Sequence, residues 1–340
     1  MKHFKFIVLF ALISACGSQG KLPRASKEIV VDKIWDQAPH SAFTDLIRFN
    51  DAWYCTFREA PGHVSGPVGQ ARVLKSADGK NWVSMASFEM KGLDIRDPKL
   101  SVAPGNRLMV LMDVEAYKEG KVASRLPYIS FSGDGNNFSQ PEKSVVDPSI
   151  ATWSDWVWRV TWHKGMGYAV VYQQAALYVL KTKDGKYFEK VSKLDIDGSP
   201  NESTIRFDKN DKMYVMVRRE KDDYMGMLAK SDAPYTNWTI NRMNYRLGGP
   251  NFLFLNDNTL CIGSRLYETE NGKTKSSTVV FLSDLNGKIY KTVRLPSSGD
   301  TSYPGMVIYE NQLWFSYYSS HEGKTSIYLA KIPLSQLQGT

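Results

Sequence analysis

The sequence predicts an all-β protein, a six-bladed β-propeller of four-stranded blades in which an N-terminal strand closes the ring. Two sets of internal repeats carry this prediction. The first is a turn that reads hydroxyl residue, spacer, Asp-Gly, two residues and an aromatic, recurring at intervals of roughly fifty residues. Its good copies are residues 76–82, 132–138 and 182–188, and its weaker copies are residues 231–238 and 283–287. Asp bonds its own downstream amides and Gly accepts a positive φ, so each copy is expected to be a tight turn leading into a strand.

The second set of repeats counts the blades. Each copy has a turn-like lead, an alternating strand, a polar turn and another alternating strand, which is the pattern of a hairpin. The six copies start near Ser41, Asp97, Trp158, Asn201, Pro250 and Ser302. The last copy supplies only about three strands of its own, so residues 28–35 are expected to complete that blade.

Length and composition favour one large β domain. The chain has 340 residues, of which 12% are aromatic, and it shows no long helical periodicity and no linker. We therefore expect a single propeller over residues 28–335, acting as a monomer.

The N-terminus has the layout of a secretory signal. Lys2 and Lys5 precede an apolar run, residues 6–12, that is too short to span a bilayer. Residues 1–15 are therefore expected to be a signal peptide. Residues 13–16 resemble a bacterial lipoprotein cleavage box, which makes Cys16 the expected lipidation site and residues 16–27 a tether. The alternative is an ordinary signal in which Cys16 is incidental. The expected location is the periplasm or the outer membrane, with the lipid anchor as the only membrane contact.

Charge and cysteine content exclude some classes of partner. The net charge is +8 at pH 7, but the basic residues form no runs, so no nucleic-acid partner is expected. A mild basic excess suits an acidic glycan or an anionic surface. Cys55 and Cys261 fall in blades that are not neighbours, so both are expected to be buried thiols rather than a disulfide. The five histidines are scattered in the sequence, so neither a metal site nor a cofactor is expected.

The Asp-Gly turns resemble the Asp boxes of the sialidase (neuraminidase) superfamily, whose members are six-bladed propellers. The likeness covers nearly the whole chain after the signal, and the blade count agrees with it. Asp boxes are structural turns on the outside of blades, so they specify the fold strongly and the chemistry weakly.

Candidate functional residues come from the strand starts, because the innermost strands of a propeller converge on its axis and their leading residues line a central mouth. These positions are unusually polar and aromatic. They are His40, Ser41, Arg96, Asp97, Trp153, Trp156, Trp158, Arg159, Glu202, Asn251, Ser302 and Tyr303.

The sialidase resemblance implies roles for four residues. Glu202 and Arg218 are similar to a fourth-blade glutamate and one arginine of the carboxylate-binding triad, and Arg265 stands for the late arginine of that triad. Tyr303 falls where sialidases carry the nucleophilic tyrosine, and Glu202 would act as its base.

Two departures from the sialidase pattern argue against sialic acid as the substrate. Where sialidases have an Arg-Ile-Pro motif in the first blade, this chain has residues 40–43, His-Ser-Ala-Phe. This stretch contains no arginine, so the arginine triad is incomplete. The general-acid aspartate expected before the first Asp box is also missing, because residues 62–66 occupy that stretch.

The expected activity is that of an exo-acting glycosidase on an acidic or otherwise decorated sugar, which needs a proton donor and a base or nucleophile. The candidate catalytic residues are Asp97, Glu202 and Tyr303, with Glu59 as a weaker alternative. The candidate substrate-binding residues are His40, Arg58, Arg96, Trp158, Arg159, Arg218, Asn251 and Arg265. Each also has a structural interpretation as a strand-end ion pair, a turn cap or inter-blade packing.

Two other functions remain open at this stage. One is a lipoprotein that binds glycan in the propeller mouth without catalysis. The other is a polysaccharide lyase at uronic acids, in which His40 and Tyr303 would serve.

Overall fold

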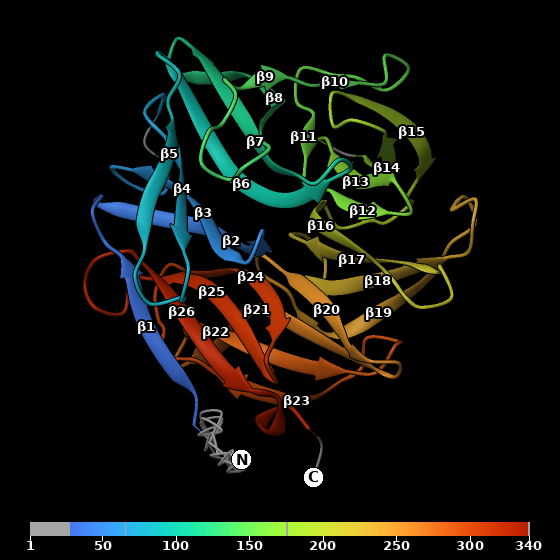
Figure 1. The fold of residues 1–340 in the computed structure, drawn as a ribbon. Coiled ribbons are helices and arrows are strands. Elements are labelled where there is room, and N and C mark those ends of the chain that lie inside the picture. The colour runs from blue at the N-terminus through green and yellow to red at the C-terminus, as the bar shows by residue number, and fades with distance from the viewer. Residues whose placement is uncertain (1–27, 65, 175, 339–340) are drawn as a thin grey trace, which may run out of the picture.

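The computed structural model describes residues 28–64, 66–174 and 176–338, and these residues form six sheets around a common axis (Figure 1). The predicted six-bladed propeller is confirmed. The helical element of the described part is a single 3-10 turn, Leu334–Gln336. In that part no helix is long and apolar enough to span a bilayer. The expected signal peptide, Cys16 and the tether lie outside the described residues.

The first two blades follow the four-stranded pattern, with the strands hydrogen-bonded in sequence order. Blade one consists of β2 (His40–Phe49), β3 (Ala52–Ala60), β4 (Gln70–Ser76) and β5 (Val83–Phe88). Blade two consists of β6 (Leu93–Ala103), β7 (Arg107–Lys118), β8 (Lys121–Ser132) and β9 (Glu142–Lys143).

The third blade departs from that pattern in detail. Its innermost strand is broken into two short pieces that both pair with the next strand, and a short parallel strand is added at the outer edge. In sheet order the elements are β11 (Trp156–Val157) and β12 (Thr161–His163), then β13 (Met166–Tyr172), β14 (Leu177–Thr182), β15 (Tyr187–Lys193) and β10 (Val145–Val146).

The last three blades complete the ring. Blade four is β16 (Pro200–Phe207), β17 (Met213–Arg219), β18 (Met225–Ser231) and β19 (Thr239–Arg246), and blade five is β20 (Asn251–Asn256), β21 (Thr259–Glu270), β22 (Lys273–Ser283) and β23 (Ile289–Arg294). Blade six is β24 (Thr301–Tyr309), β25 (Gln312–Ser319), β26 (Ser326–Pro333) and β1 (Val30–Trp35). Because β1 pairs antiparallel with β26, the N-terminal strand closes the ring as predicted.

The three good Asp-Gly turns join the third and fourth strands of blades one to three. In the first, the amide of Gly79 donates to Ser76 Oγ at 2.8 Å, and the amides of Lys80 and Asn81 donate to Asp78 Oδ1 at 2.9 Å. These amide bonds hold the pKa of the Asp78 carboxyl well below its usual range. The turn is therefore closed by its own side chains.

Each of these turns also packs against the second strand of the preceding blade. A Cβ atom added at Gly79 would lie 2.2 Å from the ring of Trp314, and one at Gly135 would lie 2.0 Å from Tyr54 Oη. A Cβ atom added at Gly185 would lie 2.9 Å from the sulfur of Met109. The glycines thus provide the close approach between neighbouring blades as well as the positive φ of the turn.

The core lies between neighbouring blades. Trp53 of blade one stacks on Trp314 of blade six with ring centroids 4.0 Å apart, and both are buried. Cys55 and Cys261 are buried free thiols, as expected from the sequence.

Candidate active site

Four innermost strands share an irregularity near their start. In blades one, two, four and six the ladder to the second strand shifts register at this point, and a non-glycine residue adopts a left-handed φ. These residues are Phe43 (φ 65), Asp97 (φ 43), Glu202 (φ 31) and Tyr303 (φ 50). A bulge re-aims a side chain, and a left-handed φ outside glycine is found where the surroundings enforce it, often at functional sites. The bulges bring the three candidate catalytic residues together with Phe43.

Tyr303, Glu202 and Arg218 form one hydrogen-bonded group. Tyr303 Oη donates to Glu202 Oε1 at 2.6 Å, and Arg218 Nη1 donates to Tyr303 Oη at 3.1 Å. Arg218 also forms an ion pair with Glu202. Tyr303 is 7% exposed and Glu202 9% exposed, so the group is almost desolvated.

The Tyr303 hydroxyl stays protonated at neutral pH. Burial raises its pKa well above the usual value and the charge of Glu202 adds to the shift, while Arg218 and Arg265 oppose it. A phenol in this state is a nucleophile only if a base takes its proton, and Glu202 Oε1 is the acceptor in place.

Asp97 is the third catalytic candidate at the same mouth and the second that carries a carboxyl. It is 6% exposed, and its Oδ1 atom accepts no hydrogen bond from the described residues. Burial raises the pKa of Asp97, and Glu202 raises it further, while Lys99 and Arg96 oppose the shift. A carboxyl that keeps its proton to a higher pH is suited to donate it.

Of the predicted arginines, two lie over aromatic rings at the mouth and one is buried in an ion pair. Arg265 lies over the ring of Tyr303, 5.6 Å from its centroid, and donates to the carbonyl of Thr301. Arg96 lies over Phe43 at 5.7 Å. Arg58 is fully buried and makes a bidentate pair with Asp94, so it supports the site from behind.

Arg159 and Asn251 are not brought to Tyr303. Arg159 pairs with Asp45, while Asn251 donates to the Pro304 carbonyl at 3.0 Å. Both line a hollow of about 250 Å³ formed by residues farther along the innermost strands. In blade five the left-handed residue at the strand start is Gly249, which has no side chain to present to Tyr303. In blade three the extra residue falls in the break between β11 and β12, where no residue takes a left-handed φ.

The predicted tryptophans play different parts. Trp158 is 2% exposed and meets Tyr303 edge to face at 6.3 Å, so it packs behind the mouth. Trp156 stacks on Tyr172 with centroids 5.6 Å apart, whereas Trp153 is exposed. Glu59 is buried and accepts hydrogen bonds from Trp35, Gln70 and Arg72, which is a structural role.

Several residues at the mouth were missed in the sequence analysis. A hollow of about 180 Å³ is lined by Trp156, which the sequence analysis named, and by Arg125, Ser154, Tyr172, Gln173, Gln174, Ser199, Pro200 and Asn201, the residue before Glu202. Lys99 is buried over Trp158, and burial lowers its pKa to about 8. Lys99 follows Asp97 closely in β6, so its position in the strand was the available signal.

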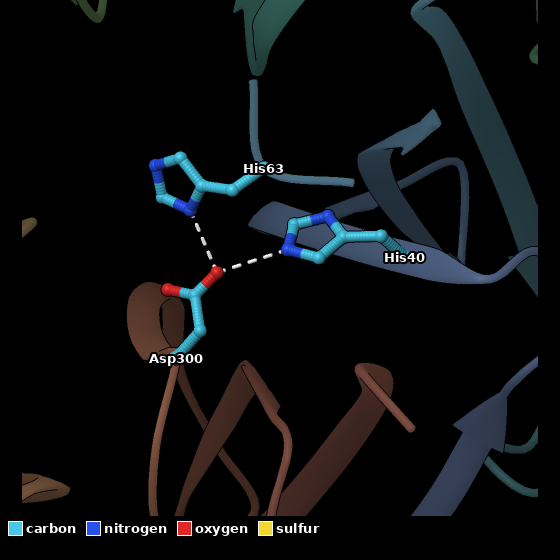
Figure 2. A group of neighbouring side chains, drawn as sticks. All are labelled: His40, His63 and Asp300. Atoms are coloured by element: carbon cyan, nitrogen blue, oxygen red, sulfur yellow. Dashed lines mark hydrogen bonds and ion pairs between the residues drawn. The ribbon is translucent and has the colours of Figure 1, made fainter. Parts of the chain in front are cut away.

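His40 lies at the rim of the mouth, where its Nε2 atom is 2.9 Å from Asp300 Oδ2 (Figure 2). His63 Nδ1 reaches the same oxygen at 2.7 Å. Tyr318 Oη donates to the other carboxylate oxygen at 2.7 Å. Burial opposes the effect, but the hydrogen bonds from the two histidines hold the pKa of Asp300 well below its usual range. His63 comes from the loop in which a general-acid aspartate was expected.

Comparison with known proteins places the fold. No protein-family model and no curated protein matches the chain. Among solved structures, a protein of unknown function from Dyadobacter fermentans is similar, with a TM-score of 0.72 and 18% identity over 89% of this chain and 99% of that one.

Two further similar structures are enzymes. The sialidase of Trypanosoma rangeli has a TM-score of 0.63 and 11% identity, and the match covers 88% of this chain and 56% of that one. The GH93 α-L-arabinofuranosidase of Fusarium graminearum has a TM-score of 0.65 and 14% identity, over 89% of this chain and 97% of that one. The chain therefore has the six-bladed propeller fold of the sialidases and this arabinofuranosidase, as the sequence resemblance implied.

Proposed function

We propose that the protein is an exo-acting glycoside hydrolase that acts on an acidic or otherwise decorated glycan. The observation that carries this proposal is the buried hydrogen bond from Tyr303 to Glu202, with Arg218 bonded to both. The fold supports it, since similar structures include a sialidase bound to sialic acid and an arabinofuranosidase bound to arabinobiose.

The proposed reaction proceeds in two displacements. Tyr303 Oη attacks the anomeric carbon while Glu202 accepts the phenol proton, and Asp97 gives its proton to the departing glycosidic oxygen. Water then attacks the glycosyl-tyrosine after losing a proton to Asp97. The Tyr303 oxygen leaves and recovers its proton from Glu202. Two inversions give net retention of configuration.

The charges around the group indicate an anionic substrate. Arg218 and Arg265 flank Tyr303, and Arg96 lies over Phe43 at the same mouth. Guanidinium groups bind carboxylates through paired N–H bonds, so a sugar acid fits these positions.

The depth of the group favours cleavage from a chain end. Asp97, Glu202 and Tyr303 are each less than one-tenth exposed, so the middle of a polysaccharide has little access to them. A terminal sugar inserted into the mouth meets all three.

The test is a product screen with the protein lacking residues 1–20. Sialylated, uronic-acid and rhamnose-containing oligosaccharides are incubated with it, and released monosaccharide is read by mass. We expect Tyr303→Phe and Glu202→Gln to lower kcat by about 10²- to 10⁴-fold while substrate binding is kept. Tyr317→Phe and Glu59→Gln are matched controls, since both residues are buried but bond elsewhere, and they should retain activity. Binding without any product would leave a glycan-binding propeller and sink the catalytic proposal.

The lyase alternative is tested in the same screen by ultraviolet absorbance of an unsaturated uronide. Its candidate residues are His40 and Tyr303; His40 bonds Asp300 whereas Tyr303 bonds Glu202, so the described contacts do not join them as a pair and the hydrolase is the function that the site supports better.

We also propose export as a lipoprotein anchored through Cys16, in the periplasm or the outer membrane. Metabolic labelling with a fatty acid tests it: the wild-type chain should be labelled and Cys16→Ser should not. Label on both, or on neither, would contradict the anchor.

A further inference from the structure

Three metal-ligating side chains from distant parts of the chain meet at the rim of the mouth. His40 begins β2 in blade one, His63 lies in the loop between β3 and β4, and Asp300 directly precedes β24 in blade six. Their ligating atoms all lie within 4.8 Å of one another. Figure 2 shows both imidazole rings turning a nitrogen toward one oxygen of Asp300.

The donor set defines the class of ion. Two imidazole nitrogens and one carboxylate oxygen suit zinc and related divalent transition ions, whereas calcium and magnesium prefer oxygen ligands throughout. Ligand atoms in a tetrahedral zinc site with bonds near 2 Å stand about 3.3 Å apart. The two nitrogens stand 2.9 and 2.7 Å from Asp300 Oδ2 and lie within 4.8 Å of each other, so an ion would bind after the three side chains adjust toward this spacing.

Hydrogen bonds from neighbouring residues hold two of the three ligands in place. Ser41 donates its amide to the Thr325 carbonyl at 3.0 Å, which fixes the backbone beside His40. Tyr318 Oη bonds the second oxygen of Asp300 at 2.7 Å, the kind of outer contact that orients a ligating carboxylate.

The present polar contacts leave His40 poorly satisfied. The side chain is buried, and its Nδ1 atom has no hydrogen-bond partner in the described part of the chain. Its ring therefore depends on the single contact to Asp300, an oxygen that it shares with His63. An ion bound at Nε2 would replace the shared contact, because each of the three donor atoms would then have its own bond to the ion; it would not supply a partner for Nδ1.

We propose that His40 Nε2, His63 Nδ1 and Asp300 Oδ2 bind a divalent transition-metal ion, with zinc as the first candidate. Three protein ligands leave a coordination position open for water or an anionic oxygen, and solvent reaches the site because the side chain of His63 is 47% exposed.

The ion would lie beside the Tyr303 group rather than within it. The Phe43 ring stands between them, with its centroid 5.0 Å from that of His63 and 5.0 Å from that of Tyr303. The proposal does not depend on the glycosidase activity, because binding is measured without a substrate.

The experiment is calorimetric titration of chelator-treated protein with Zn²⁺, repeated with Co²⁺ so that its visible absorption reports the coordination. We expect one ion per chain and a micromolar or tighter Kd. His63→Ala should weaken binding at least 100-fold, and Asp300→Asn should do the same. His63 is half-exposed, so its loss should leave the fold intact, and circular dichroism checks this.

His163→Ala is the matched control. His163 also bonds a carboxylate, Asp211, at 3.0 Å, but it lacks a second histidine, so this variant should bind the ion as the wild type does. Absence of stoichiometric binding by the wild type would overturn the proposal and leave the three residues as a hydrogen-bonded cluster. Equal binding by the wild type and His63→Ala would overturn it as well, since the ion would then sit elsewhere.

Discussion

Side chains at the mouth are placed by local backbone strain. Phe43, Asp97, Glu202 and Tyr303 all take left-handed φ values, a conformation that costs a non-glycine residue on the order of 1–3 kcal/mol. The hydrogen bond from Tyr303 to Glu202 and the ion pair with Arg218 offset part of that cost. Strain and bonding together make these side chains rigid before any substrate arrives.

Asp97→Asn tests the proton donor. Burial raises the pKa of Asp97, so the wild-type protein should keep its acid form to a higher pH than a free carboxyl would and lose the proposed hydrolytic activity as that group ionises. The variant should lower kcat/KM by about 10²- to 10⁴-fold on alcohol leaving groups and should lack this alkaline limb. The measurement is a pH profile of hydrolysis. An unchanged limb in the variant would assign it to another group.

Asp113→Asn tests how a buried carboxyl affects stability, as Asp97→Asn tests how one affects activity. Burial raises the pKa of Asp113 well above its usual value, so the folded state binds this proton more tightly than the unfolded state does. The stability that this protonation contributes is full below the unfolded pKa of about 3.9 and is lost as pH rises toward the folded pKa. Asp113→Asn should therefore be at least as stable as the wild type at pH 8, with a smaller advantage at pH 4, in urea unfolding at both pH values. A variant that is less stable at pH 8 would contradict the assignment.

At the scale of elements, the Asp-Gly turns pack each blade against the preceding one. Gly135 has φ 72, and an added Cβ would lie 2.0 Å from Tyr54 Oη of blade one. Gly120 has φ 74 at the β7–β8 turn, and nothing lies within 4 Å of its Cβ position. Substitutions at Gly120 and Gly135 therefore separate the cost of the left-handed backbone from the cost of the contact with the neighbouring blade.

Gly120→Ala should cost about 1–2 kcal/mol of unfolding free energy, because only the left-handed backbone is penalised. Gly135→Ala should cost about 1–3 kcal/mol more, because the methyl group must displace Tyr54. Denaturant unfolding of both variants checks the difference. Equal losses would mean that the turn does not bear on the neighbouring blade.

The sequence predicted these turns and the hairpins because both are local: an Asp-Gly pair and an alternating strand carry their own conformational signal. It also predicted Tyr303, Glu202 and Asp97 at the mouth. It did not show that a left-handed residue in a bulge places these three side chains together, while Arg159 and Asn251 belong to blades in which no non-glycine residue takes that conformation at the strand start. One inserted residue reverses the alternation of a strand, and no composition pattern marks it. The cluster of His40, His63 and Asp300 was missed because ring closure, not sequence spacing, joins blades one and six.

At the scale of the whole molecule, the ring is one closed set of blade contacts, and β1 completes it. Its residues pair with β26 from Val30 opposite Lys331 to Trp35 opposite Ile327. The Trp35 indole also donates to Glu59 of blade one at 2.6 Å, so the strand bridges the seam between the last blade and the first.

A chain that begins at residue 37 should expose the edge of β26. We expect its thermal midpoint to fall by more than about 5 °C, since each kcal/mol lost moves the midpoint of a large domain by about 2–4 °C. An uncovered strand edge also promotes association, so light scattering should show oligomers. A chain that begins at residue 28 is the control. Equal midpoints for the two chains would show that blade six is stable with three strands.

The pairing of β1 with β26 has a mechanical consequence. Any pull on the segment that precedes residue 28 is delivered to β1, which is the outer strand of the last blade's sheet and leads along the chain into the first blade. Force is thus applied where the ring closes: a pull large enough to separate β1 from β26 would open the ring of blades before it unfolded the remaining strands of any blade.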